Sequence, residues 1–124
     1  MTAPDRIASQ AADLLRSFNH ATFDIGDDWQ YPGHAYSAVG SLAYLIRMLP
    51  QAIEQTARPM ERTHHDGRLL IDGGGDSDQA VGHLREAVKT AAQIAALLAQ
   101  AVEHVHVSTS SMGMDLRGLP ELEE

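Results

Sequence analysis

The chain has 124 residues, with 17 acidic and nine basic side chains, a formal net charge of −8 and no cysteine. The length suits one domain with a modest core, and the lack of cysteine excludes disulfides and thiolate metal ligands. The basic residues are scattered and include a single lysine, Lys89. Nucleic acids and anionic membranes favour clustered positive charge, so we expect neither as the main partner.

Two further classes of segment are missing from the sequence. No run of about 18 apolar residues is present that could cross a bilayer. The first residues, MTAPDRIASQAAD, do not show a basic end followed by an apolar stretch, so no secretory signal is expected. We therefore predict a cytoplasmic protein.

A short amphipathic helix is predicted over residues 4–19. Pro4 suits the first turn of a helix. Apolar residues then recur at steps of four, three and four, at Ile7, Ala11, Leu14 and Phe18. The following residues, up to Gly33, contain glycine and proline and are predicted to form a loop.

A second helix is predicted over residues 34–58, with a kink at Pro50. A proline inside a helix costs about 3 kcal/mol, whereas each buried large aliphatic side chain contributes about 1.5–3 kcal/mol. The apolar positions keep their phase across Pro50, which favours one kinked helix, and Pro59 is expected to end it. These positions include Leu42, Ile46, Leu49 and Ile53.

A third helix, over residues 77–106, has the clearest pattern. Its apolar residues alternate steps of three and four, which is the heptad spacing of a coiled coil. They are Val81, Leu84, Val88, Ala91, Ala95, Leu98, Val102 and Val105. Further apolar residues at Ile94, Leu97 and Ala101 widen this stripe, so the helix is expected to meet two neighbours.

The three glycines at 73–75 could cradle a phosphate or join two helices. They lie between Asp72 and Asp76, with Asp78 close behind, and three carboxylates would repel a phosphate. Asp76 or Ser77 would cap the third helix, and Asp78 would favour its positive end. We therefore predict a joint here, and a flexible acidic tail at residues 108–124.

Two Glu-x-x-His pairs raise a di-metal alternative, because such pairs project inward in di-iron helical bundles. They are Glu61 with His64 and Glu103 with His106. In a simple hairpin the two pairs would be roughly 40 Å apart, and only an antiparallel dimer could bring them together. We expect no metal or other cofactor.

Arg58 and His64, in RPMERTH, resemble the Arg-x4–6-His pattern of HEPN-type ribonucleases, which are small all-α dimers. The resemblance implies that His64 acts in acid–base chemistry on a ribose 2′-hydroxyl and that Arg58 stabilises phosphate charge. Members of that family usually have a polar residue directly after the arginine, where this chain has Pro59.

The run WQYPGHAYSAVGSLAYLIRMLPQAIEQ resembles small uncharacterised helical proteins of actinobacteria. That resemblance implies a lineage, and it carries no function.

Together these patterns predict an all-α single domain over residues 1–107, in which the second and third helices form a long antiparallel hairpin and the first packs across it. Part of the longest stripe would stay uncovered, which is a marker of association. We predict a homodimer with a four-helix core and a role in protein–protein interaction or scaffolding rather than catalysis. The identity of any further protein partner is left open. The residues expected in the core and interface are Leu42, Ile46, Leu49, Ile53, Leu84, Val88, Leu98 and Val102.

Overall fold

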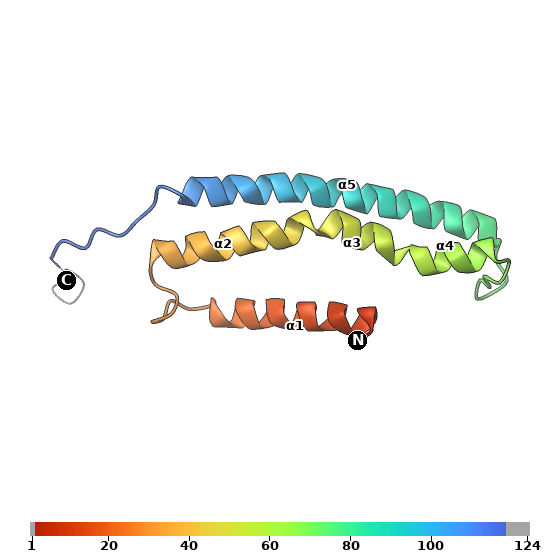
Figure 1. The fold of residues 1–124 in the computed structure, drawn as a ribbon, viewed down its shortest axis with the longest axis horizontal. Coiled ribbons are helices and arrows are strands. Elements are labelled where there is room, and N and C mark those ends of the chain that lie inside the picture. The colour runs from red at the N-terminus through yellow and green to blue at the C-terminus, as the bar shows by residue number, and fades with distance from the viewer. Residues whose placement is uncertain (1, 119–124) are drawn as a thin grey trace. The chain divides into compact units, whose positions relative to one another are not determined.

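The computed structural model describes residues 2–118. This part of the chain is helical and contains no strand, so the all-α prediction is confirmed. Along the described residues, no helix is both long enough and apolar enough to cross a membrane. The helices are α1 (Pro4–Ala21), α2 (Pro32–Arg47), α3 (Leu49–Thr56), α4 (Arg58–His65) and α5 (Ser77–Thr109) (Figure 1).

The chain divides into two units. Of the described chain, the first contains residues 2–35 and 113–118, that is, α1, the loop after it and the first turn of α2; the second contains residues 36–112. Within the first unit, the ring of Phe18 meets that of Trp29 edge-on, with centroids 5.9 Å apart. Helix α1 runs two residues beyond the expected end, to Ala21, and the Thr22 hydroxyl donates to the Phe18 carbonyl at 2.8 Å. The packing of α1 across the hairpin stays a prediction.

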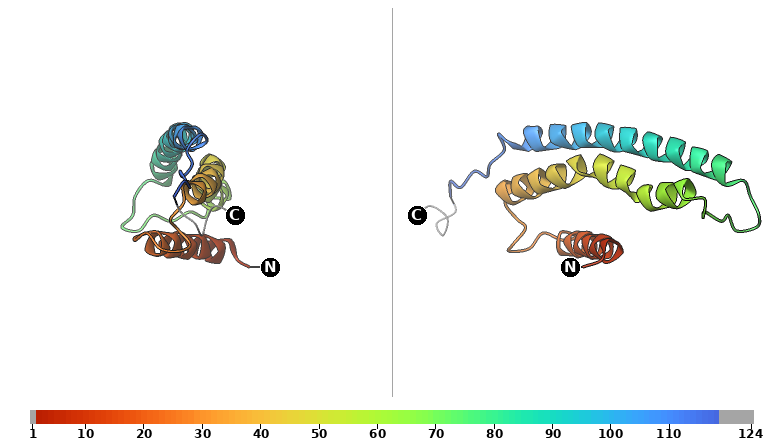
Figure 2. Two further views of the ribbon diagram at one scale, coloured as in Figure 1. Left: turned by 90° about the vertical axis from the view of Figure 1, so that its left-hand side faces the viewer. Right: turned by 45° about the vertical axis from the view of Figure 1, so that its right-hand side comes forward.

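The second unit is a helical hairpin. Helices α2, α3 and α4 follow one another along α5, which runs in the opposite direction (Figures 1 and 2). The connection between α4 and α5 contains Gly73 and Gly74, whose φ angles of 85° and 82° favour glycine. Asp76 caps α5, as predicted, because its carboxylate accepts from the Asp78 backbone N–H at 2.9 Å.

The helix expected over residues 34–58 is interrupted at Met48 and Ala57, so the structure has three successive helices there. Pro50 and Pro59 each stand in the first turn of a helix, where the missing N–H costs nothing because first-turn donors have no helical partner. At the interruptions the backbone N–H bonds three residues back: Met48 to the Leu45 carbonyl at 3.1 Å and Ala57 to the Glu54 carbonyl at 3.4 Å. Pro59 therefore begins α4 rather than ending the helical run.

Small side chains line the seam between α5 and the opposing helices. The buried apolar residues of the described chain are Ala43, Ala57, Val81, Ala92, Ala95 and Ala99. Among the residues expected in the core and interface, Leu98 is 47% exposed. The others are partly buried: Leu42, Ile46, Leu49, Ile53, Leu84, Val88 and Val102.

The seam of α5 follows Ala92, Ala95 and Ala99. Ala95 was expected from the heptad, whereas the expected Ala91 and Leu98 are each replaced by the next residue. A straight α-helix has 3.6 residues per turn, so a strict heptad drifts around it by about 20° per repeat. The buried Val81 and Ala99 are separated by 18 positions, which is five turns of a straight helix. This drift moves the buried line onto the alanines and leaves Leu98 outside it.

The predicted tail lies only partly in the described chain. Ser108 and Thr109 belong to α5, and residues 110–118 are outside any helix. Residues 119–124, which hold most of the acidic side chains of that segment, lie outside the described residues.

Candidate interaction surface

A row of exposed apolar residues runs along α5 beside the seam. We call it the apolar strip; its members follow one another at steps of four, three, four, three and four. Ile94, Leu98 and Val105 are 60%, 47% and 51% exposed, and Leu97, on its outer border, is 63% exposed. The strip consists of Ala87, Ala91, Ile94, Leu98, Ala101 and Val105.

The strip lies at a fixed angle to the seam. Ala91, Ile94 and Leu98 each directly precede a seam alanine. Neighbouring residues of an α-helix are about 100° apart around the axis. The strip is therefore roughly a quarter turn from the seam, as a helix in contact with two neighbours requires.

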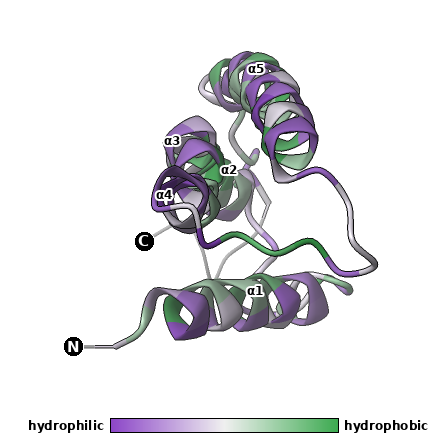
Figure 3. Cartoon of the chain, turned by 90° about the vertical axis from the view of Figure 1, so that its right-hand side faces the viewer, coloured by the Kyte–Doolittle hydropathy of each residue, from purple (hydrophilic) through white to green (hydrophobic). Residues whose placement is uncertain are grey.

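Helix α2 carries a matching row, formed by Ala38, Leu42 and Leu45. Leu42 and Leu45 directly precede Ala43, which is buried, and Ile46, which is partly buried; Leu45 is 39% exposed. Because the two helices are antiparallel and have the same hand, rows displaced in the same sense from the seam lie on the same side of the hairpin. We call this row and the apolar strip together the apolar face. Figure 3 shows apolar segments on both α2 and α5.

On the other side of the hairpin, charged side chains lie among apolar ones in a groove that we call the polar groove. This open groove of about 500 Å³ lies between α3, α4 and α5, with Glu54, Glu61, Arg85 and Lys89 among its lining residues. Arg85 Nε is 3.8 Å from Glu61 Oε1. Acidic and basic side chains thus balance one another in this groove, in contrast to the uncharged apolar face.

Histidine side chains join the two arms at both ends of the hairpin. At the loop end, His64 Nε2 lies 2.6 Å from Asp78 Oδ1, which links α4 to the start of α5. At the other end, the His106 ring stacks on Tyr36 with centroids 4.6 Å apart. His106 also lies so close to α2 that a Cβ on Gly40 would be 2.9 Å from its Nε2.

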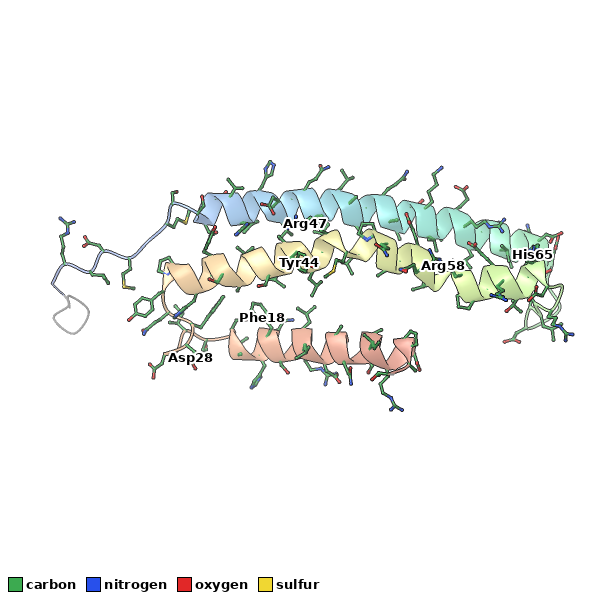
Figure 4. The ribbon with its side chains drawn as sticks, viewed as in Figure 1. Phe18, Asp28, Tyr44, Arg47, Arg58 and His65 are labelled. Atoms are coloured by element: carbon green, nitrogen blue, oxygen red, sulfur yellow. The ribbon has the colours of Figure 1, made fainter. Side chains whose placement is uncertain are left out.

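The two residues of the ribonuclease alternative both belong to α4. Arg58 is its first residue and His64 its seventh, which separates their Cα atoms by about 9 Å along the helix. Figure 4 shows Arg58 on this helix, with His65 at the loop end. His64 is engaged with Asp78, so the structure assigns this histidine a contact across the hairpin.

The residues of the di-metal alternative lie at opposite ends of the hairpin. Glu61 and His64 belong to α4, near the start of α5, whereas Glu103 and His106 lie near the end of α5. Asp78, the partner of His64, is 28 residues before His106 in one helix, or about 42 Å. Within residues 2–118 there is no group of three His, Asp or Glu side chains that could hold a metal ion.

Two contacts of the hairpin were not predicted from the sequence. The His64–Asp78 pair joins residues 14 apart across the glycine joint, and it depends on α4, which was not expected. The Tyr36–His106 stack had one signal in the sequence, a glycine inside a helical pattern at Gly40, because such a glycine often marks a close approach.

A charged pair follows the hairpin in the chain. Arg117 donates side-chain and backbone hydrogen bonds to Asp115, with Nη2 2.7 Å from Oδ2. These bonds lower the pKa of the Asp115 carboxyl and raise that of the Arg117 guanidinium. Both side chains are exposed and two residues apart in the chain, so the pair is local.

Comparison of the chain with protein-family models, curated proteins and solved structures finds no match. The proposals for its function therefore depend on the apolar face and on the contacts described above.

Proposed function

We propose that this chain is a non-enzymatic interaction or scaffolding protein that acts as a homodimer, with the apolar face as its binding surface. The observation that carries the proposal is the exposure of large aliphatic side chains at heptad spacing along α5. Ile94, Leu98 and Val105 are about half exposed or more, whereas the seam beside them is closed by alanines.

Covering the exposed aliphatic side chains of the strip would stabilise the protein. Full burial of a large aliphatic side chain contributes about 1.5–3 kcal/mol. With about half of that area still in contact with water, each of these three residues leaves roughly 1 kcal/mol unrealised. Alanines in the seam contribute little area of their own, so the hairpin gains from covering its apolar face.

A second copy of the hairpin can supply that cover. Two hairpins in contact through their apolar faces would place four helical arms around a common apolar centre, as in a four-helix bundle. A dimer with two-fold symmetry uses the same surface on both copies. Such dimers are the commonest protein oligomers.

The test is a solution mass with matched variants. Light scattering should give twice the chain mass for the unaltered protein. Leu98→Asp places a charge in the middle of the strip and should shift the mass to that of one chain, because an unpaired buried charge is strongly unfavourable. The control is Gln100→Asp, which adds the same charge at an exposed position of α5 outside the strip, and should leave the dimer intact.

A single-chain mass for the unaltered protein, with the strip protected from solvent by its own α1, would refute the proposal. So would a dimer that Leu98→Asp and Gln100→Asp affect equally, because the strip would then not be its interface.

A further inference from the structure

Given the homodimer proposed above, on which this step rests, we infer that the two α5 helices pack antiparallel, with the two-fold axis crossing the strip between Ile94 and Leu98. The partner's α5 then covers the α5 strip, and the partner's α3–α4 segment covers the α2 row, because Gly40 lies beside His106 and Glu61 beside Arg85 in the hairpin. The occupant of the apolar face is thus a second copy of this chain in a defined orientation.

The orientation follows from the handedness of the hairpin. In each copy, α2 lies about a quarter turn from the strip, on one side of α5. If the two α5 helices were parallel, a two-fold axis would place the two α2 helices on opposite sides of the α5 pair. Leu42 and Leu45 would then remain uncovered. If the α5 helices are antiparallel, both α2–α4 arms lie on the same side, α2 of each copy faces the α3–α4 segment of the other, and the four arms close into a bundle.

The side-chain volumes along the strip fit this pairing. In an antiparallel pair of heptad helices, first and fourth heptad positions face each other across the interface. Ile94 then faces the partner's Leu98, and Ala91 faces the partner's Ala101. Ala87 faces the partner's Val105, so the largest side chains meet at the centre and a small residue receives the valine.

The length of the face sets how much of an interface it can supply. The α5 strip spans 18 residues from Ala87 to Val105, or about 27 Å, and the α2 row spans seven residues, or about 10 Å. At 8–10 Å per helix, the projected area of the apolar face is on the order of 350 Å² per copy. A stable interface buries about 800 Å² per partner, so the α3–α4 segment beside the strip must contribute the remaining contact.

The same orientation does not assemble the di-metal alternative. Glu61 lines the polar groove. Glu103 lies seven residues from Ala96, another lining residue of that groove, and so falls on nearly the same side of α5. The antiparallel contact is made through the opposite side of the seam.

Cysteine cross-linking tests the orientation directly, because the natural chain has no cysteine. Full-length Ala91→Cys and Ala101→Cys are nearly isosteric changes at exposed positions, so each variant should keep its fold and its dimeric mass. One variant is labelled with a heavy isotope, the two are mixed and re-equilibrated in a thiol–disulfide buffer, and the linked species are separated by mass.

An antiparallel pair predicts that the mixed 91–101 disulfide exceeds either self-linked species about tenfold, which corresponds to about 1.4 kcal/mol. Gln93→Cys, in the polar groove, serves as the control and should not cross-link. Predominant 91–91 and 101–101 links in a dimer would overturn the antiparallel orientation and leave the homodimer standing. A dimer without links at either position would overturn it as well. A single-chain mass before oxidation would instead refute the homodimer itself.

Discussion

Two apolar rows run along α5, one residue apart in sequence, and they differ most in the middle of the helix. There the seam holds Ala92, Ala95 and Ala99, all buried, whereas the strip holds Ile94 and Leu98, both about half exposed or more. In most amphipathic helices the largest apolar side chains face the core. Over this stretch of α5 the smallest do, because the arms of the hairpin are close together. The inner row therefore sets the distance between the arms, and the outer row carries the apolar area available for association.

The largest effect in this comparison should come from enlarging a seam residue. Ala95→Leu adds three carbon atoms at a position that is 7% exposed. Overpacking of this kind typically costs 1–3 kcal/mol, so the free energy of unfolding should fall by about that amount in urea denaturation.

The matched control for this variant is Ala96→Leu, one residue along, where the side chain borders the open polar groove. The same three carbon atoms have space there, and the change should stay within about 0.5 kcal/mol. Equal losses in the two variants would show that the seam is not the tighter of the two sites.

A smaller effect is expected at Gly40, where α2 lies close to His106 of α5. Glycine inside a helix is about 1 kcal/mol less favourable than alanine, but an alanine Cβ at position 40 would lie 2.9 Å from His106 Nε2. Gly40→Ala should therefore stabilise the protein by about 1 kcal/mol only in a His106→Ala background. In the unaltered chain that gain should be absent or reversed.

Thermal or urea unfolding of the unaltered chain, the two single variants and the double variant measures the coupling energy between positions 40 and 106. This coupling should reach about 1 kcal/mol. A coupling near zero would mean that the His106 ring moves away freely from its stack on Tyr36. The close approach of α2 to α5 would then place no constraint on residue 40.

The periodicity of α5 made its existence, its cap at Asp76 and its apolar residues predictable, because strong helical periodicity and an acidic cap are local signals. Local sequence signals could not decide which of the two rows, the seam or the strip, is buried against the other arm. A pattern with steps of three and four fits two adjacent lines on a helix, and the line that faces the other arm depends on how far the helix has drifted from a heptad. The sequence therefore identified Leu98 and Ala95 as one stripe, and the structure separates them.

Helix α4 illustrates a different limit. The sequence pattern predicts that Pro59 stops a helix, yet a proline that follows one helix can equally stand in the first turn of the next. Only the bonds after it distinguish the two cases, and Glu61 N–H bonds to the Ala57 carbonyl at 3.0 Å. His64 consequently faces α5 and reaches Asp78, a contact that sequence spacing alone could not place.

The smallest expected effect concerns the contact between His64 and Asp78. It tests whether the ends of the hairpin contribute as much to the free energy of unfolding as the seam does. Asp78→Asn removes the charge beside His64 and at the start of α5. The Asp78 side chain is 85% exposed, so solvent screens the pair, and the loss should be below about 1 kcal/mol. Because the effect is electrostatic, it should shrink as salt is raised in urea unfolding. Asp72→Asn, an exposed change in the loop outside the helix, is the control and should have no measurable effect. If Asp78→Asn cost more than Ala95→Leu, the polar end rather than the alanine seam would be the main support of the hairpin.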